Sequence, residues 1–296
     1  MHTDRRRFLQ GAAGLPAAAA WAAQPPVELP KIKFEGHELT RLIIGSNPFY
    51  GYSHFNATLD GIMREWYTQD RRLQALKHAE ETGINTWQSN QSRESIEDWK
   101  RLRSGGGRMN VLVLSDYSLD GDYSTMPLLS RMGALGVAHH GGRTDERFRE
   151  GKMELVREFL NAVHDAGMPA GVSSHNPAAI EYIEERGWPA DFYMTCMYRV
   201  TRTREEARKE FGEAPLGETF MERDPERMCN VVRKTARTCF AFKVMGAGRN
   251  GNRPEDAFRY VLTHIKPQDA VIAGMFPKFK DEVRENAELV RKVLAG

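Results

Sequence analysis

Side chains able to do chemistry follow directly after a series of short apolar segments in this chain of 296 residues. In chain order they are Asn47, Gln88, Asp116, the pair His139 and His140, His175, Cys196 or Tyr198, and Lys243. Imidazole, carboxylate, phenol and amine groups are the usual acids, bases and electrophiles of enzymes. If the apolar segments end at one place, these side chains meet there. The candidate catalytic residues are His140, Lys243, Asp116 and Tyr198.

Asp116, His140 and His175 also form a possible metal site. One carboxylate and two imidazoles are a ligand set suited to Zn, Mn or Fe, with positions left open for water or substrate. A divalent ion held there would polarise a carbonyl or acidify a bound hydroxyl. The opposing interpretation is structural: His175 caps the next helix, the histidine pair is partly core, and Asp116 bonds loop amides. No local motif decides between the two.

Lys243 stands inside an apolar run, residues 239–244, where a charge is costly unless it is paired. One functional interpretation is a catalytic or Schiff-base lysine, because desolvation lowers the pKa of a lysine. Another is a clamp for a substrate anion beside the turn 246–249. The structural alternative is an ion pair with Asp116.

The segments that carry these residues have the pattern of buried parallel strands. Residues 191–196, 239–244 and 269–273 are continuous apolar runs, each followed by turn residues and a helical pattern. Five more units precede them, with strands expected at 42–45, 84–87, 111–114, 135–138 and 169–172. Eight such units predict one α/β domain over residues 31–296, a (β/α)8 barrel with catalytic groups at the carboxyl ends of its strands. Residues 31–39 read as a hairpin that closes the barrel bottom.

Residues 1–24 form a separate segment, with a sequence pattern unlike that of the barrel. Arg5, Arg6 and Arg7 precede Phe8 and an alanine-rich apolar run that is too short to span a bilayer stably. This resembles a twin-arginine export signal. We therefore expect residues 1–24 to be a signal peptide and the barrel to be periplasmic or secreted after export in the folded state. That route mildly favours a bound cofactor.

The composition limits the classes of binding partner that we expect for this protein. The formal net charge is +2, and basic residues are scattered among acidic ones, which gives no electrostatic case for nucleic acid. A small-molecule substrate is the expected partner, with no stable membrane span. The three cysteines, Cys196, Cys229 and Cys239, read as buried small hydrophobes, with the first and third on adjacent strands. The sequence does not set the oligomeric state.

Several segments resemble the aldo/keto reductase superfamily in order and spacing. They are LTRLIIGSNPFYG, ALKHAEETGINTWQSN, the strand that ends in His139-His140, GMPAGVSSHNP and GMFPKFKDEVRENAELV. The resemblance covers nearly all of the chain after the signal and implies the same barrel. It also implies an NADP site at the last loop and helix, where the candidate cofactor-binding residues are Gly274, Lys278, Arg284 and Asn286.

The catalytic residues of that superfamily are mostly replaced. Its Asp-Thr-Ala after strand two aligns with Gln88-Ser89-Asn90, its tyrosine with Arg93, and its lysine with Asp116. The strand-four histidine survives as His139 or His140. At the positions that contact the nicotinamide in that superfamily, this chain has Ser173, Ser174 and Met194.

Three functions therefore stay open. The first is an enzyme acting on a carbonyl or sugar-type small molecule, an oxidoreductase by resemblance, that lacks the standard tetrad. The second is a metal-dependent lyase or isomerase using Asp116, His140 and His175. The third is a barrel that binds a small ligand without catalysis.

Three further segments are expected near the surface. Residues 52–67 are expected to form an active-site loop, and residues 202–208 a solvated helix face. The aromatic residues near the first two strand ends are either a sugar-stacking platform or loop packing. They are Phe49, Tyr50, Tyr52, Phe55 and Trp87.

Overall fold

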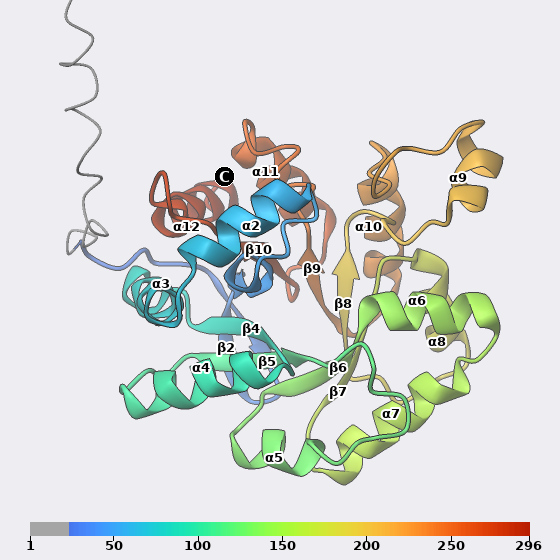
Figure 1. Cartoon of the computed structure of the whole chain (residues 1–296), viewed down its shortest axis with the longest axis horizontal. Helices are drawn as coiled ribbons and strands as arrows, with labels where there is room; N and C mark the ends of the chain where they lie inside the picture. Colours follow the sequence, from blue (N-terminus) through green and yellow to red (C-terminus); the bar gives the residue numbers. More distant parts are fainter. Residues whose placement is uncertain (1–23) are drawn as a thin grey trace, which may run out of the picture.

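Eight parallel strands close into a barrel in the computed structural model, which describes residues 24–296 (Figure 1). The predicted export signal, apart from its last residue, lies outside the described residues. The strands are β3 (Leu42–Gly45), β4 (Thr86–Asn90), β5 (Asn110–Leu114), β6 (Gly136–His139), β7 (Ala170–Ser174), β8 (Phe192–Cys196), β9 (Thr238–Phe242) and β10 (Ala270–Gly274). The last strand pairs with the first, and this pairing closes the ring. The predicted (β/α)8 barrel is confirmed.

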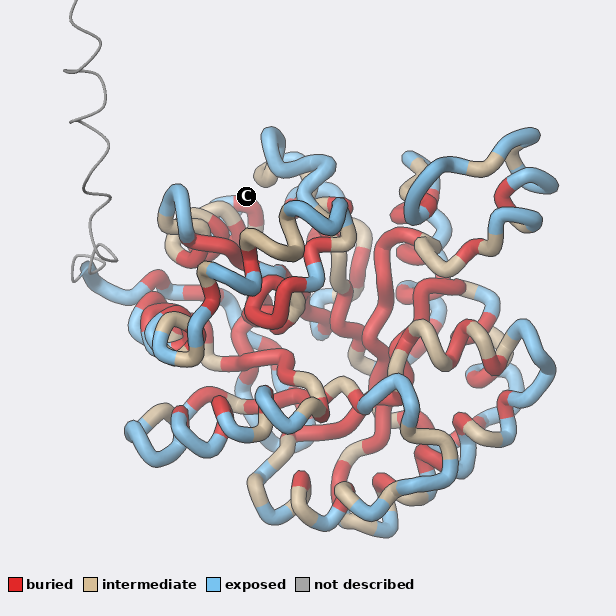
Figure 2. Tube along the Cα trace, viewed as in Figure 1, coloured by how far each residue is buried: buried red, intermediate tan, exposed pale blue. Residues whose placement is uncertain are grey.

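The helices follow the strands in the chain, and most of them cover the outer face of the barrel, so its strands are buried on both sides (Figures 1 and 2). They are η1 (Asn47–Tyr50), α2 (Ala57–Trp66), α3 (Gln69–Thr82), α4 (Arg93–Ser104), α5 (Met126–Arg131), α6 (Gly141–Glu150), α7 (Glu154–Asp165), α8 (Pro177–Glu185), α9 (Arg204–Phe211), α10 (Asp224–Lys234), α11 (Pro254–His264) and α12 (Glu282–Leu294). None of the helices in residues 24–296 is long and apolar enough to cross a membrane.

Several expected boundaries are wrong. The second strand, expected at 84–87, is Thr86–Asn90, and the fifth, expected at 169–172, is Ala170–Ser174. Residues 52–67 are not all loop, because α2 fills most of the segment and Asn56 caps it by accepting the N–H of Leu59 at 2.9 Å. Lys243 lies one residue beyond β9 and not inside it. Its φ of 56° is left-handed, which no residue of an extended strand adopts.

The predicted hairpin closes the barrel bottom. It consists of β1 (Lys31–Phe34) and β2 (His37–Thr40), which pair in antiparallel register. Phe34 packs edge-on against Phe192 at 5.4 Å and Phe240 at 5.3 Å between ring centroids. The Phe192 ring fits because β7 has Gly171 opposite it, where a Cβ would lie 2.3 Å from the ring. One end of the barrel is therefore sealed by aromatic packing, and the carboxyl end of the strands is left to face solvent.

The cysteine predictions also hold. Cys196, Cys229 and Cys239 are buried and free. β8 and β9 are neighbours, and Cys196 is paired in register with Phe242. The thiols act as small apolar groups, and burial raises the pKa of each.

Truncating Phe34 of the hairpin tests this packing. We expect Phe34→Ala to lower the free energy of unfolding by about 3–5 kcal/mol, because it removes a buried ring and leaves a cavity. Urea unfolding followed by circular dichroism measures the loss. The matched control is Phe279→Ala, since Phe279 is 80% exposed and should change stability little. Equal losses in the two variants would show that the hairpin does not seal the barrel.

Candidate functional site

The two consecutive histidines at the end of β6 face opposite sides of the barrel wall. His139 faces outward: its Nδ1 lies 2.8 Å from Thr144 Oγ1, and its ring packs edge-on against Phe159 of α7. Side chains alternate along a strand, so His140 faces the barrel mouth. There burial, and to a lesser extent the neighbouring His175 and Lys243, lower the pKa of His140. His140, the histidine chosen from the sequence, is therefore the one at the site.

His175 follows β7 and is held by a carboxylate that sequence reasoning did not single out. Asp145 Oδ2 accepts the Nδ1–H of His175 at 2.8 Å, with the proton placed on Nδ1 by this bond. Asp145 lies on α6, which begins directly after His140 with Gly141. A Cβ at Gly141 would lie 2.7 Å from Ser173 Oγ and 3.0 Å from the His175 ring, so only glycine lets α6 start this close to β7. The signal available in the sequence was this glycine at a strand end.

Asp145 is a buried charge surrounded by donors. Besides the His175 ring it accepts from Ser174 Oγ at 2.5 Å, from Thr201 Oγ1 at 2.7 Å and from the backbone N–H of His175. Burial by itself raises the pKa of Asp145, but these hydrogen bonds outweigh it and hold the pKa below its ordinary value. Burial lowers the pKa of His175 more than Asp145 raises it. The pair is thus a carboxylate and a neutral imidazole, with Nε2 as the nitrogen that carries no proton.

His140 is a neutral imidazole with one ring nitrogen unused. Its Nδ1 is buried and has no hydrogen-bond partner within the described residues. Burial is the main cause that lowers the pKa of His140 to about 4, and the neighbouring His175 ring and the charge of Lys243 add to it. A buried polar atom without a partner costs free energy, so its presence at a strand end marks a functional position.

Lys243 is held in a strained conformation above the mouth. Both it and Ala247, four residues later, have left-handed φ values, 56° and 52°. Strained non-glycine residues cluster at functional sites, where the surrounding structure holds them. The amine lies 5.3 Å from the centre of the Phe242 ring. Glu218 forms an ion pair with His54. Against the effect of burial, this hydrogen bond and ion pair lower the pKa of Glu218, and the charge of Lys243 adds to the effect.

The other two candidate catalytic residues are engaged elsewhere. Asp116 is exposed and accepts the N–H of Ser118 at 2.9 Å and its hydroxyl at 2.6 Å, so it organises its own loop and is not paired with Lys243. These bonds lower the pKa of Asp116. Tyr198 accepts the side-chain N–H of Asn250 at 2.9 Å and borders a separate cavity. The structure therefore brings together His140, His175 and Lys243, and leaves Asp116 at the edge and Tyr198 apart.

A cavity of about 400 Å³ opens beside Lys243. His140 and His175 are not among the residues that line it, and His175 borders a different cavity. It extends from Gln88 of β4 and Lys243, directly after β9, to the start of α12. Its walls are mostly apolar, as in typical small-molecule sites. They include Pro48, Leu59, Met63, Phe242, Met245, Ile272 and Phe276.

The residues that the resemblance implies for NADP do not gather around this cavity. Gly274 and Asn286 border it. Lys278 is exposed, with its amine 5.5 Å from the Phe279 ring. Arg284 donates to the carbonyl of Pro25 and pairs with Glu288. Neither cation of this set borders the cavity, so these residues do not fit a nucleotide phosphate there.

The metal interpretation stays a prediction from the sequence. Across residues 24–296 no group of three or more His, Cys, Asp and Glu side chains is arranged to hold a metal ion. His175 is not the helix cap either, because Asn176 caps α8 by accepting the N–H of Ala178.

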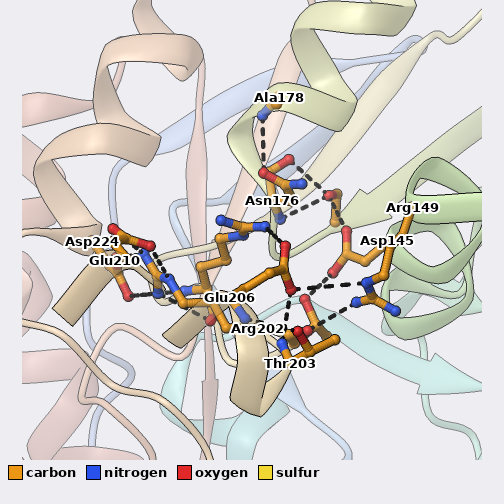
Figure 3. A network of polar contacts seen from close by, with 12 residues as sticks. Asp145, Arg149, Asn176, Ala178, Arg202, Thr203, Glu206, Glu210 and Asp224 are labelled. Carbon is orange, nitrogen blue, oxygen red and sulfur yellow. Dashed lines mark hydrogen bonds and ion pairs between the residues drawn. The ribbon is translucent and has the colours of Figure 1, made fainter. Parts of the chain in front are cut away.

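A buried ion pair anchors the long insertion after β8 (Figure 3). Arg202 lies against Asp224 at 2.7 Å and Glu210 at 2.9 Å, with its side chain 1% exposed. The expectation of a solvated face over residues 202–208 is therefore wrong at its first residue. This anchor fixes the neighbouring Thr201, whose hydroxyl donates to Asp145. The insertion thus contributes to the site.

The aromatic residues near the first strand ends divide into two groups. Phe49, Tyr50 and Trp87 are buried and pack in the core outside the barrel wall. Tyr52 and Phe55 are exposed, and of the five Tyr52 alone borders the cavity. The interpretation of all five residues as one sugar-stacking platform is therefore wrong.

Comparison with known proteins shows the fold alone. No protein-family model and no curated protein matches the chain. The structure is similar to the glycerol dehydrogenase AKR11B4 from Gluconobacter oxydans, with 11% identity, a TM-score of 0.48, and coverage of 90% of this chain and 95% of that one. It is also similar to a truncated 3-deoxy-D-arabino-heptulosonate 7-phosphate synthase from Thermotoga maritima, with 13% identity, a TM-score of 0.50 and 90% of each chain covered. Diverse enzymes share this TIM-barrel fold, and none of these similarities assigns a function.

Acid should destabilise the protein through His140. Its pKa is about 4 in the folded chain, against an ordinary value of 6.5. Between these values the unfolded chain binds more protons, so folding stability falls as pH falls through this window. We expect urea midpoints of His140→Gln to decline less than those of the wild type from about pH 6.5 to about pH 4. Parallel declines would contradict a buried neutral His140.

The strain at Lys243 predicts a second stability effect. Lys243→Gly should raise the free energy of unfolding relative to Lys243→Ala by about 1 kcal/mol, because glycine adopts a left-handed φ without a steric penalty. Both variants lack the amine, so thermal or urea unfolding of the pair isolates the backbone effect. A less stable glycine variant would show that the turn is not strained.

Proposed function

We propose that this protein is an enzyme that moves a proton on a small carbonyl or sugar-type molecule at the barrel mouth. The observation that carries the proposal is the buried Asp145–His175 pair, with His175 directly after β7 and close to His140 and Lys243. Lys243 borders the apolar cavity. An imidazole whose Nδ1 proton is held by a carboxylate is a common arrangement for a general base. It does not need the tyrosine of the reductase tetrad.

Each group has a separate role. His175, oriented by Asp145, accepts the proton from the carbon next to the carbonyl. The ammonium group of Lys243 faces the carbonyl oxygen, on which negative charge develops as the proton leaves. The neutral imidazole of His140 forms a hydrogen bond to that same oxygen. Residues 1–24 direct such an enzyme to the periplasm or beyond, as their sequence pattern suggests.

Deuterium exchange tests this reaction without an identified substrate. The protein is incubated in D₂O with dihydroxyacetone, glyceraldehyde or hydroxypyruvate, and proton NMR follows loss of the C–H signal next to the carbonyl. We expect Lys243→Met and Asp145→Asn to slow exchange by about 10²-fold or more, the usual contribution of a positioned acid, base or oxyanion donor. The control is Lys280→Met, which removes an amine from the same cavity away from the cluster.

Three results would contradict the proposal. One is exchange at the wild-type rate in Lys243→Met. Another is no exchange with any of the three compounds. The third is exchange that a chelator abolishes and Zn²⁺ restores, which would favour the metal-dependent lyase or isomerase.

A further inference from the structure

The outer end of the cavity is lined by carboxylates where the resemblance to reductases places phosphates. Glu282 and Glu285, both in the first turn of α12, border the cavity with Asn286. The free N–H groups at the start of a helix are a usual anion site. Here the protein's own carboxylates use the local donors: Asp281 accepts the N–H of Arg284 at 3.0 Å, and Glu282 accepts the N–H of Phe276 at 2.7 Å.

Of the two lysines at this end, Lys278 is exposed and lies outside the cavity lining, and Lys280 lines the cavity. Lys280 pairs with Glu285 at 2.5 Å. Burial raises the pKa of Glu282, so this carboxyl takes up a proton more readily than an exposed one and suits a hydroxyl partner. A phosphate entering here would meet two carboxyl groups and no unpaired cation among the described residues that line the cavity at this end.

The rim of the same cavity carries two exposed aromatic side chains. Tyr52 is 57% exposed and Phe279 is 80% exposed, and they come from the loops that follow β3 and β10. Large apolar groups left in water at a cavity rim mark a binding surface. Aromatic rings offer a flat apolar face to a ligand ring.

We propose that this cavity binds an uncharged, hydroxylated molecule with an apolar ring, and that it excludes nucleotide phosphates. The hydroxyl groups meet Glu282 and Glu285, the ring lies against Tyr52 and Phe279, and the reactive end reaches Lys243. The position of the reactive end rests on the proposed function. The class of ligand rests on the cavity alone.

Fluorescence titration of the whole protein tests the ligand class. The probe is 4-methylumbelliferyl β-D-glucoside, an uncharged aryl sugar, and the competitors are NADPH and inorganic phosphate. We expect saturable binding of the glucoside with no displacement by either anion at millimolar concentration. Phe279→Ala should weaken glucoside binding about fivefold, which corresponds to an aromatic contact of about 1 kcal/mol. Phe55→Ala, another exposed aromatic outside the cavity lining, should leave binding unchanged.

Reversing the charge of one carboxylate is the second test of the ligand class. Glu285→Lys should weaken the glucoside and create NADPH binding that the wild type lacks. Saturable NADPH binding to the wild type, no glucoside binding, or equal effects of Phe279→Ala and Phe55→Ala would each overturn the proposal. The titration needs no turnover. The two proposals can fail separately. If Lys243→Met still binds the glucoside and the wild type shows no deuterium exchange, the proposed reaction is contradicted and the ligand class is not.

Discussion

The burial of one negative charge, that of Asp145, is the constraint on which the site depends. A buried carboxylate is costly unless hydrogen bonds replace its hydration. The donors that do so come from two separate parts of the chain: Ser174 and His175 at the end of β7, and Thr201 in the insertion after β8. Satisfying this charge therefore fixes the start of α6, the imidazole of His175 and the root of the insertion at the same time.

The opposite end of the barrel needs no such polar network. Phe34 of the hairpin packs against Phe192 and Phe240, which closes the bottom with apolar contacts. The molecule thus separates its two tasks along the barrel axis. Stability is concentrated at the sealed end. Strain at Lys243, an unpartnered nitrogen at His140 and an open cavity are concentrated at the other.

Most of the fold was predictable from the sequence because strands buried on both faces are continuous apolar runs. The eight strands were found in this way, and so was the position of His140 and His175 at strand ends. Asp145 was not predicted, because it lies on a charged helix where no local pattern separates a buried carboxylate from a solvated one. Arg202 was misjudged for the same reason, since its partner Asp224 is 22 residues away.

The strand ends predicted which groups share the mouth, but not which of them are free to act. Asp116 ends its strand as expected, yet Ser118 two residues later uses its carboxylate. Lys278 and Arg284 match the reductase pattern in sequence, yet neither lines the cavity: Lys278 lies over the Phe279 ring, and Arg284 donates to the carbonyl of Pro25. Such local competition for a side chain is a property of tertiary contacts, and a motif does not encode it.

The central claim is that His140 and Lys243 share one mouth closely enough for their charges to interact. NMR titration of ¹⁵N-labelled histidine rings measures this directly. The pKa of His140, about 4 in the wild type, should rise in Lys243→Met, because a neighbouring positive charge is removed, and stay unchanged in Lys280→Met. An unchanged pKa in Lys243→Met would show that the two groups do not face each other, and the proposed site would fail.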